Sequence, residues 1–377
     1  MIYFNNAATT YPKPDAVINA VTASLRQPPS NPYRENVNEQ STTALCRERL
    51  ATLFGFKDPE RVILSSGATE ALNIAIHGLL GENDHVVTTQ LEHNAVLRPL
   101  YQLRDTRRIG LDIVACKSPG KIDPDQIKQA IKPNTRLVIV NHASNVTGVI
   151  QDIQKIYRIC RQSGIRLLVD ISQSAGAVPI DTSVMPEALF AFTGHKSLFG
   201  PPGTGGLLVG GDVELKVWKT GGTGIKSDLE TIPDMWPLKY EPGTTNLPGI
   251  AGLAASLEYI LAQGIDKLAR KKADLSAHLC KELKKMKGIA LYTDNNVENR
   301  CGVVSFTLSE FQPRDVGYIL HESFDIRVRT GLHCAPLIHT ALGTFPEGTI
   351  RISFSTFNHH DEVETFIGAI HALKRAV

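Results

Sequence analysis

Short apolar runs alternate with helix-length segments from about residue 60 onward, and this pattern constrains the fold of the chain most. The runs are three or four residues long and mostly rich in Val, Leu and Ile, which is typical of strands buried on both faces. They lie at residues 61–64, 85–88, 111–114, 137–140, 167–169, 189–192 and 206–209. Because helix-length segments connect them, the pattern predicts an α/β fold with a mostly parallel, seven-stranded sheet covered by helices.

The chain beyond residue 210 has a different pattern. Residues 211–249 are rich in Gly, Thr and Pro, which predicts a long loop of functional importance. A single helix is expected from about Gly252 to Met286, and strands at 302–306 and 350–354 then mix with further helices. We therefore expect a large domain over residues 15–250 and a smaller α+β domain made of residues 1–14 and 251–377.

Composition narrows the class of protein. The 377 residues are 42% hydrophobic and 21% charged, as in soluble globular proteins. The net charge of +2 does not indicate a basic surface for binding nucleic acid or an acidic membrane. The first residues lack the pattern of a signal peptide, and no apolar run approaches the roughly 20 residues of a membrane helix. Six scattered cysteines without a CxxC pair indicate reduced thiols in a cytoplasm, with neither disulfides nor a metal site.

Two charged residues follow predicted strands, at the sheet edge where ligands of such folds bind. Lys196 follows the run 189–192 and precedes a glycine-rich turn; burial there would lower its pKa, as a Schiff-base lysine needs. Asp170 ends the run 167–169, where a carboxylate could keep the ring nitrogen of pyridoxal phosphate protonated. Gln173 could face the same site. The alternatives are a surface lysine in a turn and an aspartate that caps a helix.

A phosphate and a flat ring could also be held at this edge. Residues 65–70 form a strand–turn–helix junction of small residues, whose free N–H groups could cradle a phosphate, although no Walker or dinucleotide motif is present. His93 follows the run 85–88 and offers an imidazole that could stack on a cofactor ring. A purely structural histidine is the alternative.

A thiol and an arginine near the end of the chain complete the candidates. Cys334 lies in a Gly-containing loop between Arg329 and Pro336, and we expect positive charge on Arg329 and His333 to favour its nucleophilic thiolate form. The alternative is a cysteine without a role. Arg351 lies inside an apolar strand, so it needs a carboxylate from the protein or from a substrate.

Taken together and in order, these segments resemble the class V aminotransferase family of fold-type I pyridoxal-phosphate enzymes. The nearest likeness is to Suf-type cysteine desulfurases and selenocysteine lyases. The matching motifs cover nearly the whole chain: residues 6–9, 67–70, 92–95, 144–148, 170–173, 193–196, 243–246, 329–335 and Arg351. The chain departs from the Suf-type pattern at Ala68, Thr245 and Leu332.

The resemblance implies a cofactor, pyridoxal 5′-phosphate, and a role for each matching residue. It implies that Lys196, Cys334 and His93 are catalytic, with Lys196 bound covalently to the cofactor and His93 stacked on its ring. It implies cofactor contacts from Gly67, Ala68, Thr69, His93, Asn145, Asp170, Gln173, Thr193, His195 and Lys196, with Thr244 and Thr245 reaching the phosphate across a homodimer interface. It implies substrate contacts from Ala7, Asn145, Arg329 and Arg351.

The implied activity is conversion of L-cysteine to L-alanine, with the sulfur left as a persulfide on Cys334 for transfer to an acceptor protein. A selenocysteine lyase, a cystine or cysteine C–S lyase and a class V transaminase remain alternatives, because all would share Lys196 and Asp170. A non-catalytic scaffold with the same fold is a further alternative from a different class. Cys334 discriminates among the enzymes, since transamination needs no thiol.

Overall fold

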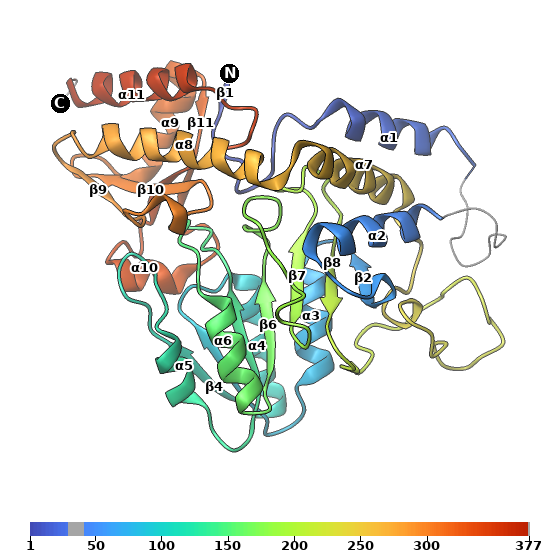
Figure 1. The fold of residues 1–377 in the computed structure, drawn as a ribbon. Helices are drawn as coiled ribbons and strands as arrows, with labels where there is room; N and C mark the ends of the chain where they lie inside the picture. The colour runs from blue at the N-terminus through green and yellow to red at the C-terminus, as the bar shows by residue number, and fades with distance from the viewer. Residues whose placement is uncertain (29–40, 376–377) are drawn as a thin grey trace.

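The predicted sheet is present, with every one of the seven runs as a strand (Figure 1). The computed structural model describes residues 1–28 and 41–375. The strands are β2 (Val62–Ser65), β3 (His85–Thr89), β4 (Gly110–Val114), β5 (Thr135–Asn141), β6 (Arg166–Asp170), β7 (Leu189–Thr193) and β8 (Gly205–Val209). They are ordered β2-β8-β7-β6-β5-β3-β4; β8 runs antiparallel to both of its neighbours, β2 and β7, and the other pairings are parallel. The α/β class and the mostly parallel seven-stranded sheet are confirmed.

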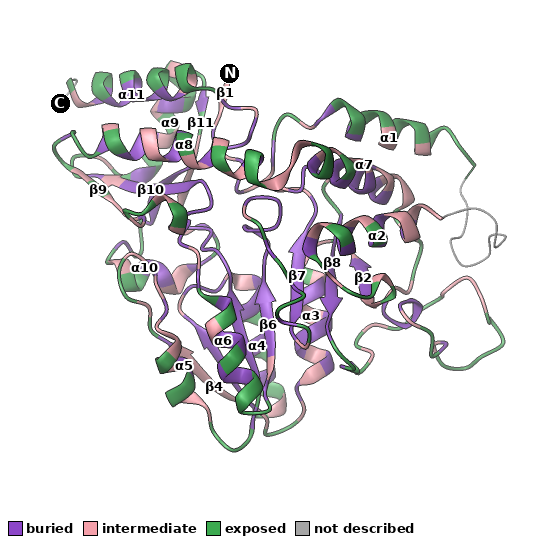
Figure 2. Cartoon of the chain, viewed as in Figure 1, coloured by how far each residue is buried: buried purple, intermediate pink, exposed green. Residues whose placement is uncertain are grey.

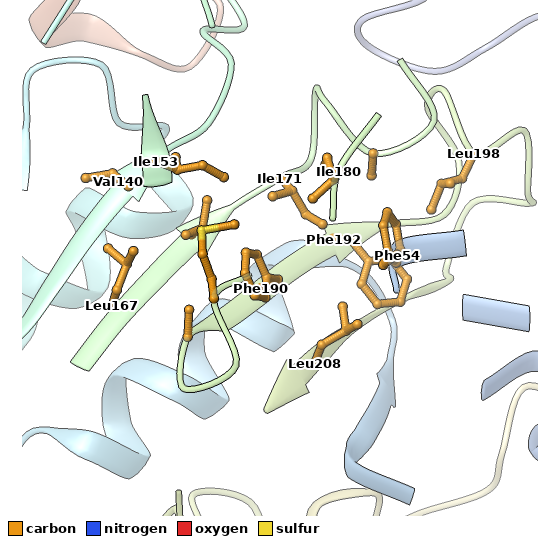
Figure 3. Close-up of a cluster of buried hydrophobic side chains, with 14 of the residues drawn as sticks. Phe54, Val140, Ile153, Leu167, Ile171, Ile180, Phe190, Phe192, Leu198 and Leu208 are labelled. Carbon is orange, nitrogen blue, oxygen red and sulfur yellow. The ribbon is translucent and has the colours of Figure 1, made fainter. Parts of the chain in front are cut away.

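Helices cover both faces of this sheet, because successive strand residues point to opposite sides. In β7, Phe190 and Phe192 belong to one buried cluster and Leu189 and Ala191 to the other. Figure 3 shows the first cluster around the two phenylalanines. That cluster takes residues from α2 (Thr42–Phe54), α5 (Pro124–Ala130), α6 (Ile153–Gln162) and α7 (Leu247–Gln263), whereas α3 (Ala68–Leu79) and α4 (Asn94–Arg107) supply the second. The sheet is consequently the most deeply buried layer, as Figure 2 shows.

A second, antiparallel sheet lies toward the end of the chain. Its order is β12 (Arg329–Gly331), β13 (Thr349–Ser353), β10 (Val303–Leu308) and β9 (Ile289–Leu291). A third buried cluster joins it to α8 (Ile265–Leu283), α9 (Pro313–Phe324) and α11 (His360–Arg375). The N-terminal strand β1 (Ile2–Tyr3) pairs with β11 (Ile326–Arg327), so the first residues of the chain join this second part of the fold. The boundaries of the two expected domains stay a prediction.

The prediction of a single helix from Gly252 to Met286 is wrong. Two helices occupy this stretch, and the first begins earlier, at Leu247, where the Asn246 side chain accepts a hydrogen bond from Gly249 N. Gly264 separates α7 from α8 with a φ of 79°, a conformation that breaks a helix and that glycine adopts without strain. The preceding stretch from residue 211 is irregular apart from one short 3₁₀ turn, η2 (Leu238–Tyr240), as expected for the long loop. No described helix is long and apolar enough to span a membrane.

Candidate active site

A cavity of about 310 Å³ opens at the carboxyl ends of the parallel strands. Its walls come from the turns after β2, β3, β5, β6 and β7, together with β12 and β13 of the second sheet. It brings together most of the residues proposed from the sequence: Ala7, Gly67, Ala68, Thr69, His93, Asn145, Asp170, Gln173, Thr193, His195, Lys196, Arg329 and Arg351. Cys334, Thr244 and Thr245 do not line it.

Sequence reasoning missed several lining residues. Asn141 and Ser172 are the most informative, since each faces the cavity from the end of a central strand or the turn after it. Their position was a usable signal, because polar residues at the carboxyl ends of parallel strands gather at one edge. Ser66 and His333, which belong to segments identified in the sequence, also line the cavity, as does Gly203.

Lys196 follows β7 in a tight turn. Gly194 N donates to Thr204 O at 2.8 Å, and Gly200 N donates to Gly194 O at the same distance, so the turn folds back on itself and directs residue 196 toward the cavity. Burial lowers the pKa of Lys196 to about 8, against an opposing effect of the Asp170 carboxylate. An appreciable fraction of this amine is therefore neutral and nucleophilic near neutral pH.

Asp170 is the last residue of β6 and lies at the inner wall of the cavity. Its Oδ1 accepts a hydrogen bond from Ser172 N at 2.9 Å, and the chain continues as a series of turns, not as a helix, so Asp170 does not cap a helix. Gln173 also reaches the cavity, where its Nε2 donates to Ala7 O at 3.0 Å. This contact ties the N-terminal segment to the wall that carries the aspartate.

His93 presents a neutral imidazole to the cavity. It is the N-cap of α4, where its Nδ1 accepts a hydrogen bond from Ala95 N at 3.0 Å. Burial, reinforced by the Lys196 charge, lowers the pKa of His93 to about 4. Because Nδ1 is an acceptor, the single ring proton lies on Nε2. A neutral ring fixed at a helix start is well placed to stack on a flat ligand.

Glu92 supports this wall from behind. Its Oε1 accepts hydrogen bonds from Thr89 Oγ1 at 2.6 Å and from Asn141 N at 3.0 Å. Burial raises the pKa of Glu92 to about 8, so the carboxyl is largely protonated at neutral pH. It consequently adds little negative charge beside Asp170.

Arg351 is a buried cation that lacks a carboxylate partner. The side chain is 1% exposed, and its Nη1 and Nη2 donate to Asn145 O at 2.9 Å and to Asn5 Oδ1 at 3.3 Å. No salt bridge involves it within the part of the chain that the structure describes, and its buried Nε has no acceptor. Burial lowers its pKa to about 9. Of the two explanations given by the sequence, a ligand carboxylate is therefore favoured.

Cys334 lies in a hollow of about 380 Å³ next to the cavity. The two share Thr69, His93 and Ala95 as wall residues, and the thiol is exposed. The Cys334 carbonyl accepts a hydrogen bond from Asn94 N at 2.8 Å, which fixes the loop to the start of α4. Arg329 Nη2 lies 3.4 Å from Cys334 Sγ, so a guanidinium stands directly beside the thiol.

The prediction that a positive charge on His333 favours the Cys334 thiolate is wrong. The imidazole is buried, and its Nε2 shares a hydrogen bond with Thr349 Oγ1 at 3.0 Å. Burial and the charge of Arg351 hold the pKa of His333 well below its usual range, so the ring is neutral. Arg329 is therefore the cation beside Sγ.

Replacing Arg329 by Gln is expected to slow alkylation of Cys334 by iodoacetamide by up to about fivefold, the size of an exposed charge interaction. Arg327→Gln is a matched control, because this exposed arginine lies two residues away and does not line the cavity. Peptide mass spectrometry at pH 7 would resolve Cys334 from the other cysteines. Equal rates in both variants would contradict a role of Arg329 at the thiol.

Unpaired polar atoms concentrate around the cavity. Among the described residues, six buried side-chain atoms without a hydrogen-bond partner belong to its lining: Asn141 Oδ1, Asn145 Oδ1, Ser172 Oγ, His195 Nδ1, His333 Nδ1 and Arg351 Nε. Such groups are costly unless a ligand or water satisfies them. The cavity is thus suited to a ligand with many polar groups.

Comparison with known proteins gives consistent results. The chain is 33% identical to a protein of Methanothermobacter thermautotrophicus named "Probable cysteine desulfurase", with 95% of this chain and 91% of that one covered. It resembles the solved structures of cysteine desulfurases from Thermococcus onnurineus (TM-score 0.90, 30% identity) and Escherichia coli (TM-score 0.88, 25% identity), in each case over 100% of this chain and 95% of the other. Since the model of the family "Aminotransferase class-V" matches residues 2–366, the chain belongs to the class V aminotransferase family.

Proposed function

We propose that the chain is a pyridoxal-phosphate-dependent cysteine desulfurase, which converts L-cysteine to L-alanine and retains the sulfur on Cys334. The observation that carries this proposal is the exposed thiol beside a cavity that holds an amine of lowered pKa, a carboxylate and a buried arginine. The names of the similar proteins support it. A transaminase would need the cavity and not the thiol.

The residues of the cavity fit the cofactor. Its volume lies at the lower end of the range usual for small-ligand sites. Gly67 is the N-cap of α3 and provides no side-chain cap, so N–H groups near Ala68 and Thr69 can meet a phosphate, with Thr193 and His195 also in the lining. Asp170 would hold the ring nitrogen, His93 would stack on the ring, and Lys196 would bind the cofactor covalently. When bound, pyridoxal phosphate supplies an electron-withdrawing ring that stabilises negative charge on the substrate.

The other residues act on the substrate. Arg351 would bind the carboxylate of the amino acid, which supplies the partner that the buried guanidinium lacks. Asn145, whose Nδ2 donates to His333 O at 2.6 Å, would position the substrate next to the loop of Cys334. With the cofactor bound, the Lys196 amine, which lines the cavity, would carry a proton to and from the substrate carbon.

The sulfur transfer balances without an external oxidant or reductant. The Cys334 thiolate attacks the substrate sulfur, so that an S–S bond forms as the bond from that sulfur to the β-carbon breaks. The electron pair of the broken bond stays on the carbon side, where protonation yields alanine. The transferred sulfur is oxidised to the persulfide level and the carbon is reduced by the same two electrons.

Replacing Arg351 by Met is expected to reduce kcat/KM for L-cysteine by roughly 30-fold or more, because the substrate carboxylate would lose a buried ion pair. The variant should remain folded, since it removes a buried charge that has no carboxylate partner among the described residues. Cysteamine lacks the carboxylate, so it distinguishes loss of carboxylate binding from a general loss of activity. We expect the preference for cysteine over cysteamine to fall in the variant. An unchanged preference would contradict a role of Arg351 in binding the carboxylate.

The activity itself is tested by incubating the purified, cofactor-loaded protein with L-cysteine and measuring alanine, sulfide and pyruvate together. Alanine without pyruvate identifies a desulfurase, whereas pyruvate identifies a C–S lyase. Alanine from L-selenocysteine alone would favour a selenocysteine lyase.

We also propose that the protein acts as a two-fold homodimer. Residues 243–246 lie outside the cavity of their own chain, and Thr244 is exposed. Thr244 and Thr245 of a second copy would complete the phosphate site. An active monomer in sedimentation at micromolar concentration would contradict this assembly. An acceptor protein would then take the sulfur from the exposed Cys334.

A further inference from the structure

A second cavity lies apart from the candidate active site, and none of its lining residues is shared with that site. It measures about 590 Å³ and is formed by α8, β9 and the turn around η3 (Val297–Asn299), with Ser118 and Pro119 from the connection between β4 and α5. Figure 1 labels α8 and β9. Ile289, Leu291 and Pro119 give it apolar walls.

Arg300 is the buried charge of this second cavity. Its side chain is 5% exposed, and the one hydrogen bond of its guanidinium within the described residues goes from Nη1 to Cys280 Sγ, at 2.9 Å. A thiol is a weak acceptor, and Arg300 Nε is buried without any acceptor. A buried guanidinium in this condition is costly unless an anion is present.

Two exposed lysines, Lys281 and Lys284, line the same cavity. Neither forms a salt bridge in the described part of the chain, and Lys284 Nζ donates to Asn295 Oδ1. Asp294, the one acidic lining residue, has Oδ1 bonded to Asn296 N at 2.8 Å and Oδ2 bonded to Asn299 Nδ2 at 3.2 Å. The cavity therefore has three cations against one carboxylate that already holds a turn.

We propose that this second cavity binds a small organic anion through its carboxylate or phosphate. Arg300 would donate to the anionic group, Lys281 and Lys284 would attract it, and a short apolar chain would contact Ile289 and Leu291. The site is also connected to the candidate active site. Ile150 N donates to Asn299 O at 2.9 Å and Cys301 N donates to Gly148 O at 3.0 Å, so the backbone around Arg300 pairs with the segment that follows Asn145.

Calorimetric titration of the cofactor-loaded protein tests the proposal, with inorganic phosphate and pentanoate as separate probes. Binding of phosphate alone supports a phosphate ligand, and binding of pentanoate supports a carboxylate with an apolar chain. We expect Arg300→Gln to weaken binding of the effective probe by at least about tenfold, as expected when a buried charged partner is removed. The double variant Lys281→Gln/Lys284→Gln should weaken it roughly threefold or more.

Lys285→Gln/Lys287→Gln is the matched control, since it removes the same charge from the same stretch and neither residue lines the cavity. It should leave the affinity within about twofold of the parent. The lysine pair decides the question if Arg300→Gln does not fold. The proposal is overturned if neither probe binds the parent, or if the two double variants weaken binding equally. Both results are independent of desulfurase activity.

Discussion

Lys196→Ala is expected to lose covalently held pyridoxal phosphate and to lower alanine production from L-cysteine by about 10²- to 10⁴-fold, because the same amine attaches the cofactor and carries a proton. Borohydride reduction of the parent followed by peptide mass spectrometry should place the cofactor on residue 196. Absorbance in the near-visible should disappear on reduction of the parent and be absent from the variant.

Lys272 provides a built-in control for this experiment. Burial lowers its pKa to about 8, as at Lys196, and its Nζ donates to Gly176 O and Ser197 Oγ, both at 3.2 Å. Lys272 does not line the cavity, so we expect the cofactor not to attach to it despite its lowered pKa. A reduced adduct on Lys272 would refute the assignment.

Attachment of the cofactor to the apoprotein should depend on pH in a defined direction. Below about 8 the Lys196 amine is mostly protonated and cannot attack, so the rate should rise as the pH increases toward that value and then level off. Stopped-flow absorbance between pH 6 and 10 would measure it. A rate that still rises up to pH 10 would indicate an unperturbed amine.

Cys334→Ala is expected to lose nearly all alanine production from L-cysteine while it keeps much of that from L-selenocysteine. Sulfur needs a thiolate to accept it as the carbon–sulfur bond breaks, whereas selenium leaves more readily. The cofactor absorbance should be unchanged, since Cys334 is not in the lining of the main cavity. Alanine should be quantified for both substrates with one enzyme preparation.

Cys116→Ala is a suitable control for loss of a thiol, because this half-buried cysteine lies away from both the cavity and the hollow of Cys334. It should retain the parent rate with both substrates. If Cys334→Ala also desulfurates cysteine at the parent rate, the thiol has no part in the reaction and a lyase or transaminase is favoured.

The sheet and one side of the site could be predicted from the sequence for a physical reason. Parallel strands end at a common edge, so Asp170, which ends β6, and Lys196, which follows β7, had to lie near each other. The break at Gly264 was missed because one glycine within an apolar helical pattern is compatible with a continuous helix. Only the backbone conformation reveals the interruption.

The other side of the site could not be predicted from local pattern. Arg329 and Arg351 reach the cavity because β12 and β13 pair in a register that places them opposite each other, and this register depends on long-range packing. His333 is neutral because it is buried and bonded to Thr349, sixteen positions further along the chain. This long-range contact could not be predicted from the residues around position 333. Cys334 and Arg351 could be singled out by their settings in the sequence, but their roles in catalysis and substrate binding came from the family resemblance.

The loop of Cys334 has a consequence for how the protein can evolve. His333 and Cys334 both adopt left-handed backbone, with φ of 51° and 60°, a conformation that costs residues other than glycine about 1 kcal/mol or more each. Glycine at position 334 would thus relieve strain even as it removed the thiol. In a lineage that no longer used the thiol, substitution of this cysteine by glycine would not destabilise the fold. A cysteine retained at this position would therefore indicate continued selection for its chemistry.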